Sequence, residues 1–212
     1  MDAIRKFANS ERFDRVLNWF KRRRTLVLKL AFPILLVRDI LTGHKPHELG
    51  FPDVSVWAII GFILVLAGAF IRLWARGHFV KGRLFTTGPY ALIRHPLYLG
   101  SLLVVVGVLF QLNDWLNWMI ILSLFAVFYG AAIIHEERSL AKEFGRQFQF
   151  YKVKTPAFIP SLTSWLRRRR AGKWGGKTFL ATGELATTLM FLSLPLLIEL
   201  IEDFVFEGML GV

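Results

Sequence analysis

The chain has 212 residues, of which 54% are hydrophobic, and its formal net charge is +12. A mean hydropathy of +0.47 is higher than a soluble domain of this length carries, and the lack of cysteine excludes structural disulfides and thiolate chemistry. The basic residues are spread over loops that flank apolar segments, which argues against nucleic acid as a partner.

Five apolar segments approach the roughly 20 residues that an α-helix needs to cross a bilayer. They comprise residues 25–41, 54–75, 96–112, 115–134 and 179–201. Only Asn113-Asp114 separates the third segment from the fourth, so these two are expected to form a helical hairpin. We therefore predict an all-α integral membrane protein with about five transmembrane helices.

The distribution of basic residues predicts the orientation, since cytoplasmic loops carry an excess of Lys and Arg. Residues 21–24 are all basic, and the connections after the second and fourth segments are also rich in Arg and Lys. The alternate connections are poor in them. We expect an integral protein of a bacterial inner membrane, with a cytoplasmic N-terminus and an external C-terminus. Its amphipathic residues 1–24 would lie along the cytoplasmic surface.

The connection between the second and third segments is dense in polar and aromatic residues. Gly88-Pro89 ends any helix that arrives from the preceding loop, and Pro96 suits the first turn of the next helix. Arg94 and His95 therefore lie just outside a helix N-terminus, a place that favours anions. Taken singly, these residues also fit a membrane anchor, a helix cap and an aromatic belt. As a group flanked by two tyrosines, they favour a functional site.

Two adjacent carboxylates, Glu136 and Glu137, follow the fourth apolar segment. A carboxylate at that place faces the helix bundle or water rather than lipid. Because neighbouring residues point about 100° apart on a helix, at most one of the two is a direct ligand, and the other pairs with a base. The candidate bases are Arg138, Lys142 and, across the bundle, Arg94.

Other polar residues give weaker indications. Arg72, near the inner end of the second segment, fits an anchor whose charged end reaches the membrane surface. The five His are scattered and no Cys supports them, so no metal site is expected. The serines have no evident His and Asp partners, so a hydrolase triad has no support.

Two motifs together resemble one enzyme family. The first reads Gly88-Pro-Tyr-x-x-x-Arg94-His95-Pro96-x-Tyr98-x-Gly100, and the second reads Glu136-Glu137-x-x-Leu140-x-x-x-Phe144-Gly145-x-x-Phe148-x-x-Tyr151-x-x-x-x-Pro156. Over about residues 72–160, their order and membrane context are similar to those of the isoprenylcysteine carboxyl methyltransferase family, whose superfamily also includes phospholipid N-methyltransferases. The resemblance implies a membrane enzyme that uses S-adenosyl-L-methionine at a cytoplasmic-side cofactor site, with a lateral opening for a lipid.

The resemblance also assigns roles by position. It implies that Arg94 acts near the reacting groups. The positions implied to bind the cofactor are Leu84, Phe85, Tyr90, His95, Pro96, Leu97, Tyr98 and Glu136. If the acceptor is an amine, His95 or Glu137 could take its proton, so Glu137 is a catalytic candidate beside Arg94. Ala132 stands where prenylcysteine-specific members have a substrate-binding Arg, which argues against prenylcysteine as the substrate.

These assignments divide the chain into four parts. Residues 1–24 form the amphipathic basic segment, and residues 25–75 form the first two transmembrane helices. Residues 76–160 form a catalytic core with the hairpin and a cytoplasmic helix, and residues 161–212 form an interfacial basic segment and the last transmembrane helix. We predict an S-adenosylmethionine-dependent methyltransferase that acts on a lipid or small amphiphilic substrate.

Two other classes of protein stay open. Membrane reductases of the sterol and steroid type share part of this helical plan and use NADPH, whose 2′-phosphate would need bases such as Arg76, Lys81 and Arg83. A membrane scaffold would bind no nucleotide-like ligand at all. The pairing of the Glu-Glu and Arg-His-Pro motifs favours the methyl donor.

Overall fold

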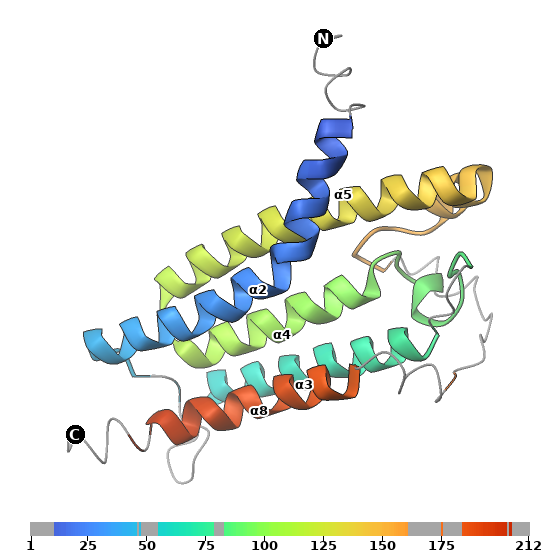
Figure 1. The fold of residues 1–212 in the computed structure, drawn as a ribbon. Helices are drawn as coiled ribbons and strands as arrows, with labels where there is room; N and C mark the ends of the chain where they lie inside the picture. The colour runs from blue at the N-terminus through green and yellow to red at the C-terminus, as the bar shows by residue number, and fades with distance from the viewer. Residues whose placement is uncertain are drawn as a thin grey trace.

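The computed structural model describes residues 11–45, 47, 55–78, 83–160, 175, 184–202 and 204. The described elements are α2 (Glu11–Thr42), α3 (Val56–Gly77), the 3-10 helix η1 (Gly88–Ala91), α4 (Pro96–Leu112), α5 (Trp115–Lys154) and α8 (Glu184–Glu202). The long helices run alongside one another in Figure 1, and the described residues contain no strand. The predicted all-α class is confirmed.

Helices α3 and α5 are each long and apolar enough to cross a membrane, whereas α4 and residues Leu185–Ile201 of α8 form shorter apolar helices. In Figure 1 the last turns of α2 and α4 and the first turns of α5 lie at one end of the bundle, and η1 lies at the other. The number of helices that span the bilayer, and the end that faces the cytoplasm, stay predictions.

Two residues explain the tight link between α4 and α5. Asn113 ends α4 in the left-handed conformation, with φ 51° and ψ 27°, which Asn tolerates better than most residues. Asp114 then caps α5, since its side chain accepts a hydrogen bond from the Leu116 N–H at 2.8 Å. The hairpin link and the bounds of the third segment are as predicted.

Two helices are longer than the apolar segments within them. Helix α2 begins at Glu11 and runs unbroken into the first segment, because no helix-breaking residue separates the two; Pro33 lies farther along, inside the helix. Helix α5 continues past residue 134 to Lys154, with a bend at Gly145, whose φ of 47° and ψ of −120° are not helical. Residues with side chains rarely adopt that φ, which explains a glycine in the second motif. The expected interfacial basic segment lies almost wholly outside the described residues.

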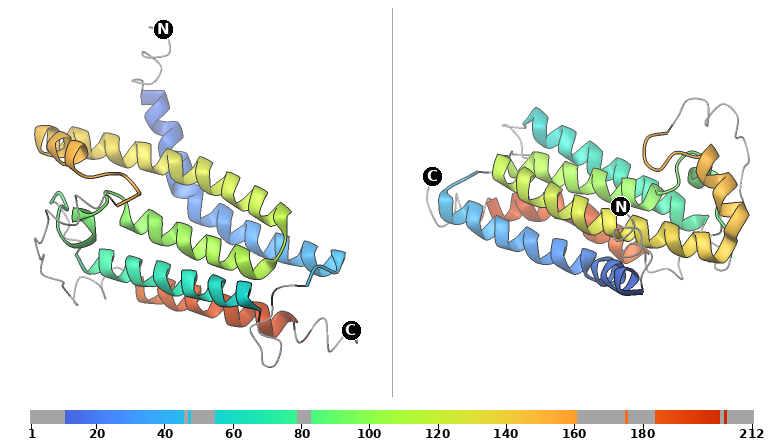
Figure 2. Two further views of the ribbon diagram at one scale, coloured as in Figure 1. Left: turned by 180° about the vertical axis from the view of Figure 1, so that it is seen from behind. Right: turned by 90° about the horizontal axis from the view of Figure 1, so that it is seen from above.

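Helices α3 and α4 pack along a seam of glycines. A Cβ added at Gly61 would lie 2.5 Å from the Gly107 carbonyl oxygen, and one added at Gly68 would lie 2.5 Å from the Gly100 carbonyl oxygen. The two backbones therefore approach as closely as small residues permit, as in helix pairs within membranes. Helix α8 lies beside α3, and α5 packs mainly on α2 (Figures 1 and 2).

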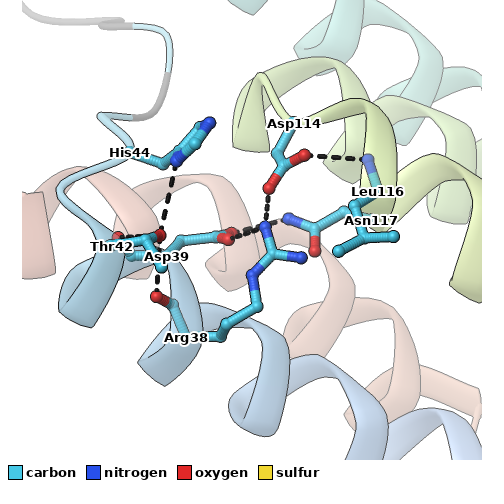
Figure 3. Close-up of polar contacts among 7 residues, drawn as sticks. All are labelled: Arg38, Asp39, Thr42, His44, Asp114, Leu116 and Asn117. Carbon is cyan, nitrogen blue, oxygen red and sulfur yellow. Dashed lines mark hydrogen bonds and ion pairs between the residues drawn. The ribbon is translucent and has the colours of Figure 1, made fainter.

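A buried polar cluster joins α2 to the start of α5 (Figure 3). Arg38 forms an ion pair with Asp39 and another with Asp114. Asn117 donates a hydrogen bond of 2.6 Å to the second oxygen of Asp39. Both carboxylates and the Asn117 side chain are buried. Because a buried carboxylate is costly unless it is paired, this cluster holds α2 against the α4–α5 hairpin.

Candidate functional site

The two sequence motifs meet at the N-terminal end of α4. The Arg94 N–H donates to the Pro156 carbonyl at 2.8 Å, and the His95 N–H donates to the Ala157 carbonyl at 3.2 Å. The buried Tyr151 hydroxyl donates to the Tyr90 carbonyl at 2.7 Å. The segment after α5 is thus hydrogen-bonded to the segment before α4, which fixes the backbone of the Arg-His-Pro triplet.

Glu137 gathers three basic side chains around one carboxylate. One of its oxygens forms an ion pair with Arg94 and lies 3.2 Å from His95 Nε2, and the other lies 2.7 Å from Lys152 Nζ. Glu137 lies beyond the predicted membrane span, which ends at residue 134. Burial opposes its ionisation, but hydrogen bonds from His95 and Lys152 and the charge of Arg94 outweigh burial and lower the pKa of Glu137 to about 2. Such a carboxylate stays ionised and serves as a counter-ion.

Glu136 contacts other residues than Glu137 does. It accepts a hydrogen bond of 2.6 Å from the Tyr98 hydroxyl, which itself accepts one of 2.6 Å from Arg24 of α2. The prediction that the two carboxylates do not act as one pair is confirmed, and Arg94 is the base that pairs with Glu137. Arg138 and Lys142, the other predicted bases, bind Asp14 of α2 instead.

A cavity of about 630 Å³ opens beside these residues and continues along α4. Its walls come from α2, α3, α4, α5, α8 and the η1 region. One end is polar and includes Arg94, Tyr98 and Glu136, whereas the other end is apolar and includes Leu112 and Ile121. A cavity with this division of polarity suits a molecule with a polar head and an apolar body.

Most of the predicted cofactor-binding residues face this cavity. Its lining includes Tyr90, His95, Pro96, Leu97, Tyr98 and Glu136, together with Arg94. Leu84 and Phe85 are not among the lining residues, although the Phe85 ring lies 5.5 Å from the Tyr90 ring. Glu137 lies behind Arg94 rather than in the lining.

Three arginines in the lining were missed or read differently from sequence. Arg24 and Arg76 line the cavity, and so does Arg72, which donates to the Ser101 hydroxyl at 2.6 Å. Arg72 therefore points into the bundle, and its interpretation as a surface anchor is wrong. A charged residue inside an apolar segment was the signal that could have found it.

Two further observations concern alternative ligands. Of the bases suggested for an NADPH phosphate, Arg76 lines the cavity, Arg83 is exposed and absent from the lining, and Lys81 lies outside the described residues. Within the described part of the chain, no group of three or more His, Asp or Glu side chains could hold a metal ion.

Comparisons with known proteins support the family resemblance that was drawn from the two motifs. Residues 56–147 match the model of the phospholipid methyltransferase family. The cobalt-zinc-cadmium resistance protein CzcN of Cupriavidus metallidurans is 32% identical over 200 residues, which cover 91% of this chain and 88% of that protein. The protein-S-isoprenylcysteine O-methyltransferase of Schizosaccharomyces pombe is 26% identical over 131 residues, or 62% of this chain and 56% of that enzyme. No solved structure matches.

Proposed function

Because the chain belongs to the superfamily of membrane methyltransferases that contains the isoprenylcysteine and phospholipid enzymes, we propose that it transfers a methyl group from S-adenosylmethionine to a lipid or amphiphilic acceptor. The reaction would take place at the cytoplasmic face of a bacterial inner membrane. The observation that carries this proposal is the Tyr98–Glu136 hydrogen bond at the polar end of a cavity that continues into apolar surroundings.

The residues at the polar end fit S-adenosylmethionine. Its amino or ribose groups need acceptors, and Glu136 is a carboxylate that lines the cavity. Its sulfonium is a cation that aromatic faces stabilise, and the Tyr90 ring lines the cavity there, while Tyr98 contributes the hydroxyl that donates to Glu136. We assign these three residues and the segment His95 to Leu97 to cofactor binding. When bound, S-adenosylmethionine would supply an activated methyl group.

The protein would act mainly by positioning the acceptor and the methyl donor relative to each other. Displacement at a sulfonium needs no covalent enzyme intermediate, so alignment of acceptor and methyl group supplies much of the rate. The planar fork of Arg94 orients an oxyanion of the acceptor, such as a carboxylate or a phosphate. Glu137 is a positioning residue, because it holds Arg94 by an ion pair while its own pKa is too low for a base at neutral pH. For an amine acceptor, we assign proton acceptance to the His95 ring, which lines the cavity.

The acceptor need not be a prenylated cysteine. Ala132, which stands where the resemblance places a substrate-binding Arg, is fully buried in α5 and carries no polar group. Relatives named as isoprenylcysteine enzymes match a smaller part of this chain than the metal-resistance protein does. A lipid or small amphiphile is therefore the acceptor class that we propose.

Ligand binding to the purified chain tests this proposal. We expect S-adenosylhomocysteine, the product form of the cofactor, to bind in calorimetry and to raise the melting temperature by mass action. Incubation with radiolabelled S-adenosylmethionine and membrane lipids should place label in the lipid extract. Binding of NADPH without binding of S-adenosylhomocysteine would overturn the proposal in favour of a reductase.

A further inference from the structure

Arg24 differs from the basic residues that precede it. Arg22 and Arg23 are exposed, whereas Arg24 is half-buried and lines the cavity. Its guanidinium donates to the Tyr98 hydroxyl, and its central carbon lies 4.8 Å and 5.5 Å from the ring centroids of Tyr98 and Tyr129. Among the described residues no carboxylate forms an ion pair with Arg24. A phenol and two aromatic faces therefore hold this cation in place, and Glu136 is linked to it only through the Tyr98 hydroxyl.

The cavity as a whole carries an excess of positive charge. Its described lining contains a single carboxylate, Glu136, against six Lys and Arg side chains: Lys21, Arg24, Lys29, Arg72, Arg76 and Arg94. Arg94 already has Glu137 as a counter-ion. Arg24 is half-buried, and a cation beside apolar walls is costly unless a ligand brings negative charge. The cavity is thus complementary to an anion.

The apolar walls of the cavity indicate that the ligand also carries an apolar part. Below Tyr98, α4 lines the cavity with one or two residues per turn, namely Ser101, Val104, Val105, Val108, Leu109 and Leu112. This face is about 21 Å long at the rise of an α-helix. Phe32 of α2 and Leu194 of α8 face it from the other walls. A free oxyanion would use the polar end alone, whereas an anionic lipid would use the whole cavity.

We propose that Arg24 binds the anionic headgroup of the acceptor, and that the acceptor is an amphiphile with a phosphate or carboxylate head and a tail along α4. This inference rests on the proposed function. Arg24 lies outside residues 56–147, which match the family model, so the N-terminal helix of this chain would supply its own substrate selection.

The test compares Arg24→Gln, Arg24→Lys and a matched control, Arg23→Gln, which removes the same charge from an exposed neighbour. Each full-length variant is melted in uncharged detergent with four probes. Dioleoyl phosphatidic acid and oleate carry both head charge and tail, dioleoylglycerol carries the tails alone, and inorganic phosphate carries the charge alone. S-adenosylhomocysteine is titrated separately, so that failure of the proposed function is distinguishable from failure of this inference.

We expect phosphatidic acid or oleate to raise the melting temperature of the parent and of Arg23→Gln. Arg24→Gln should need at least about tenfold more of that lipid for the same rise in melting temperature, because it loses a charge-assisted hydrogen bond to the headgroup. Arg24→Lys, which keeps the charge and guards against a folding defect, should fall between them. Equal stabilisation by dioleoylglycerol or by inorganic phosphate would overturn the anionic-lipid assignment. Equal responses of Arg24→Gln and Arg23→Gln would overturn the role of Arg24.

Discussion

One oxygen of Glu137 serves both Arg94, as an ion pair, and His95, whose Nε2 lies 3.2 Å away. The carboxylate on α5 therefore sets the positions of two neighbouring side chains at the entrance to α4. Its second oxygen is held by Lys152, one of the last residues of the same helix. A change at Glu137 should consequently disturb several residues, whereas a change at Arg94 should act locally.

Arg94→Lys should separate turnover from cofactor binding. The substitution keeps the positive charge but loses the planar fork, so methyl transfer should fall about tenfold or more while S-adenosylhomocysteine affinity is unchanged. Activity assays and calorimetry on the same folded preparation would measure both quantities. Equal loss of cofactor affinity would instead assign Arg94 to the cofactor.

Acid should destabilise the protein through Glu137. The pKa of this carboxyl is lowered from 4.5 to about 2 in the folded state. Its contribution is therefore fully present above pH 4.5 and is lost as the pH falls from there towards 2. The melting temperature of the parent should drop more steeply than that of Glu137→Gln over this range. Parallel curves for the two proteins would contradict the expectation.

Glu136→Gln should weaken cofactor binding. The substitution removes a charge that, if it is hydrogen-bonded to the cofactor, contributes roughly 1.5–3 kcal/mol, or about tenfold or more in affinity. Glu143→Gln is a matched control, since Glu143 is exposed on the same helix. Calorimetric titration of S-adenosylhomocysteine measures the difference. If both variants bind as tightly as the parent, the cofactor role belongs to another residue.

Gly100→Ala should destabilise the α3–α4 seam. A Cβ there would lie 2.6 Å from Arg72 Cγ and 2.7 Å from the Gly68 carbonyl oxygen, so backbone as well as side chain must shift, at a cost of about 1–3 kcal/mol. Gly130→Ala is the control, because its Cβ meets nothing within 4 Å and alanine favours the helix by about 0.5–1 kcal/mol. The melting temperature of Gly100→Ala should fall below that of the parent, whereas that of Gly130→Ala should stay the same or rise.

Reporter fusions should reveal the orientation of the helices. A reporter inserted at Asn113 is expected outside the inner membrane, and one at Gly145 in the cytoplasm, because basic loops stay inside. A reporter after the C-terminus should lie outside. A cytoplasmic signal from that last fusion would mean an even number of spans rather than five.

Apolar segments and turn residues predicted the helices well where the local signal was strong. Pro96 and Asn113-Asp114 delimit α4 as expected, because a proline start and a left-handed end are local effects. The continuity of α2 through residues 11–24 into the first apolar segment was not predictable from composition, since charged residues continue a helix as readily as they end one.

The site was predicted only in part, for a physical reason. The motif around Arg94 and Glu137 lies in two short stretches, so its contacts could be anticipated from charge and spacing. The role of Gly100 depends on α3, because the missing side chain leaves room for Arg72 to reach Ser101. Arg24 looks like its neighbours in the sequence, and only the packing of α2 separates it from them.

The polar cluster of Figure 3 also limits what the cavity can hold. Three lining residues at the apolar end, Leu35, Leu112 and Ile121, each lie within four positions of a member of that cluster. A hydrocarbon chain cannot displace buried ion pairs at low cost, so the cluster acts as a stop. If the headgroup of the proposed lipid acceptor is held at the polar end, the cluster limits the length of the tail that fits in the cavity. A tail longer than about 21 Å would lift its own headgroup away from the methyl donor.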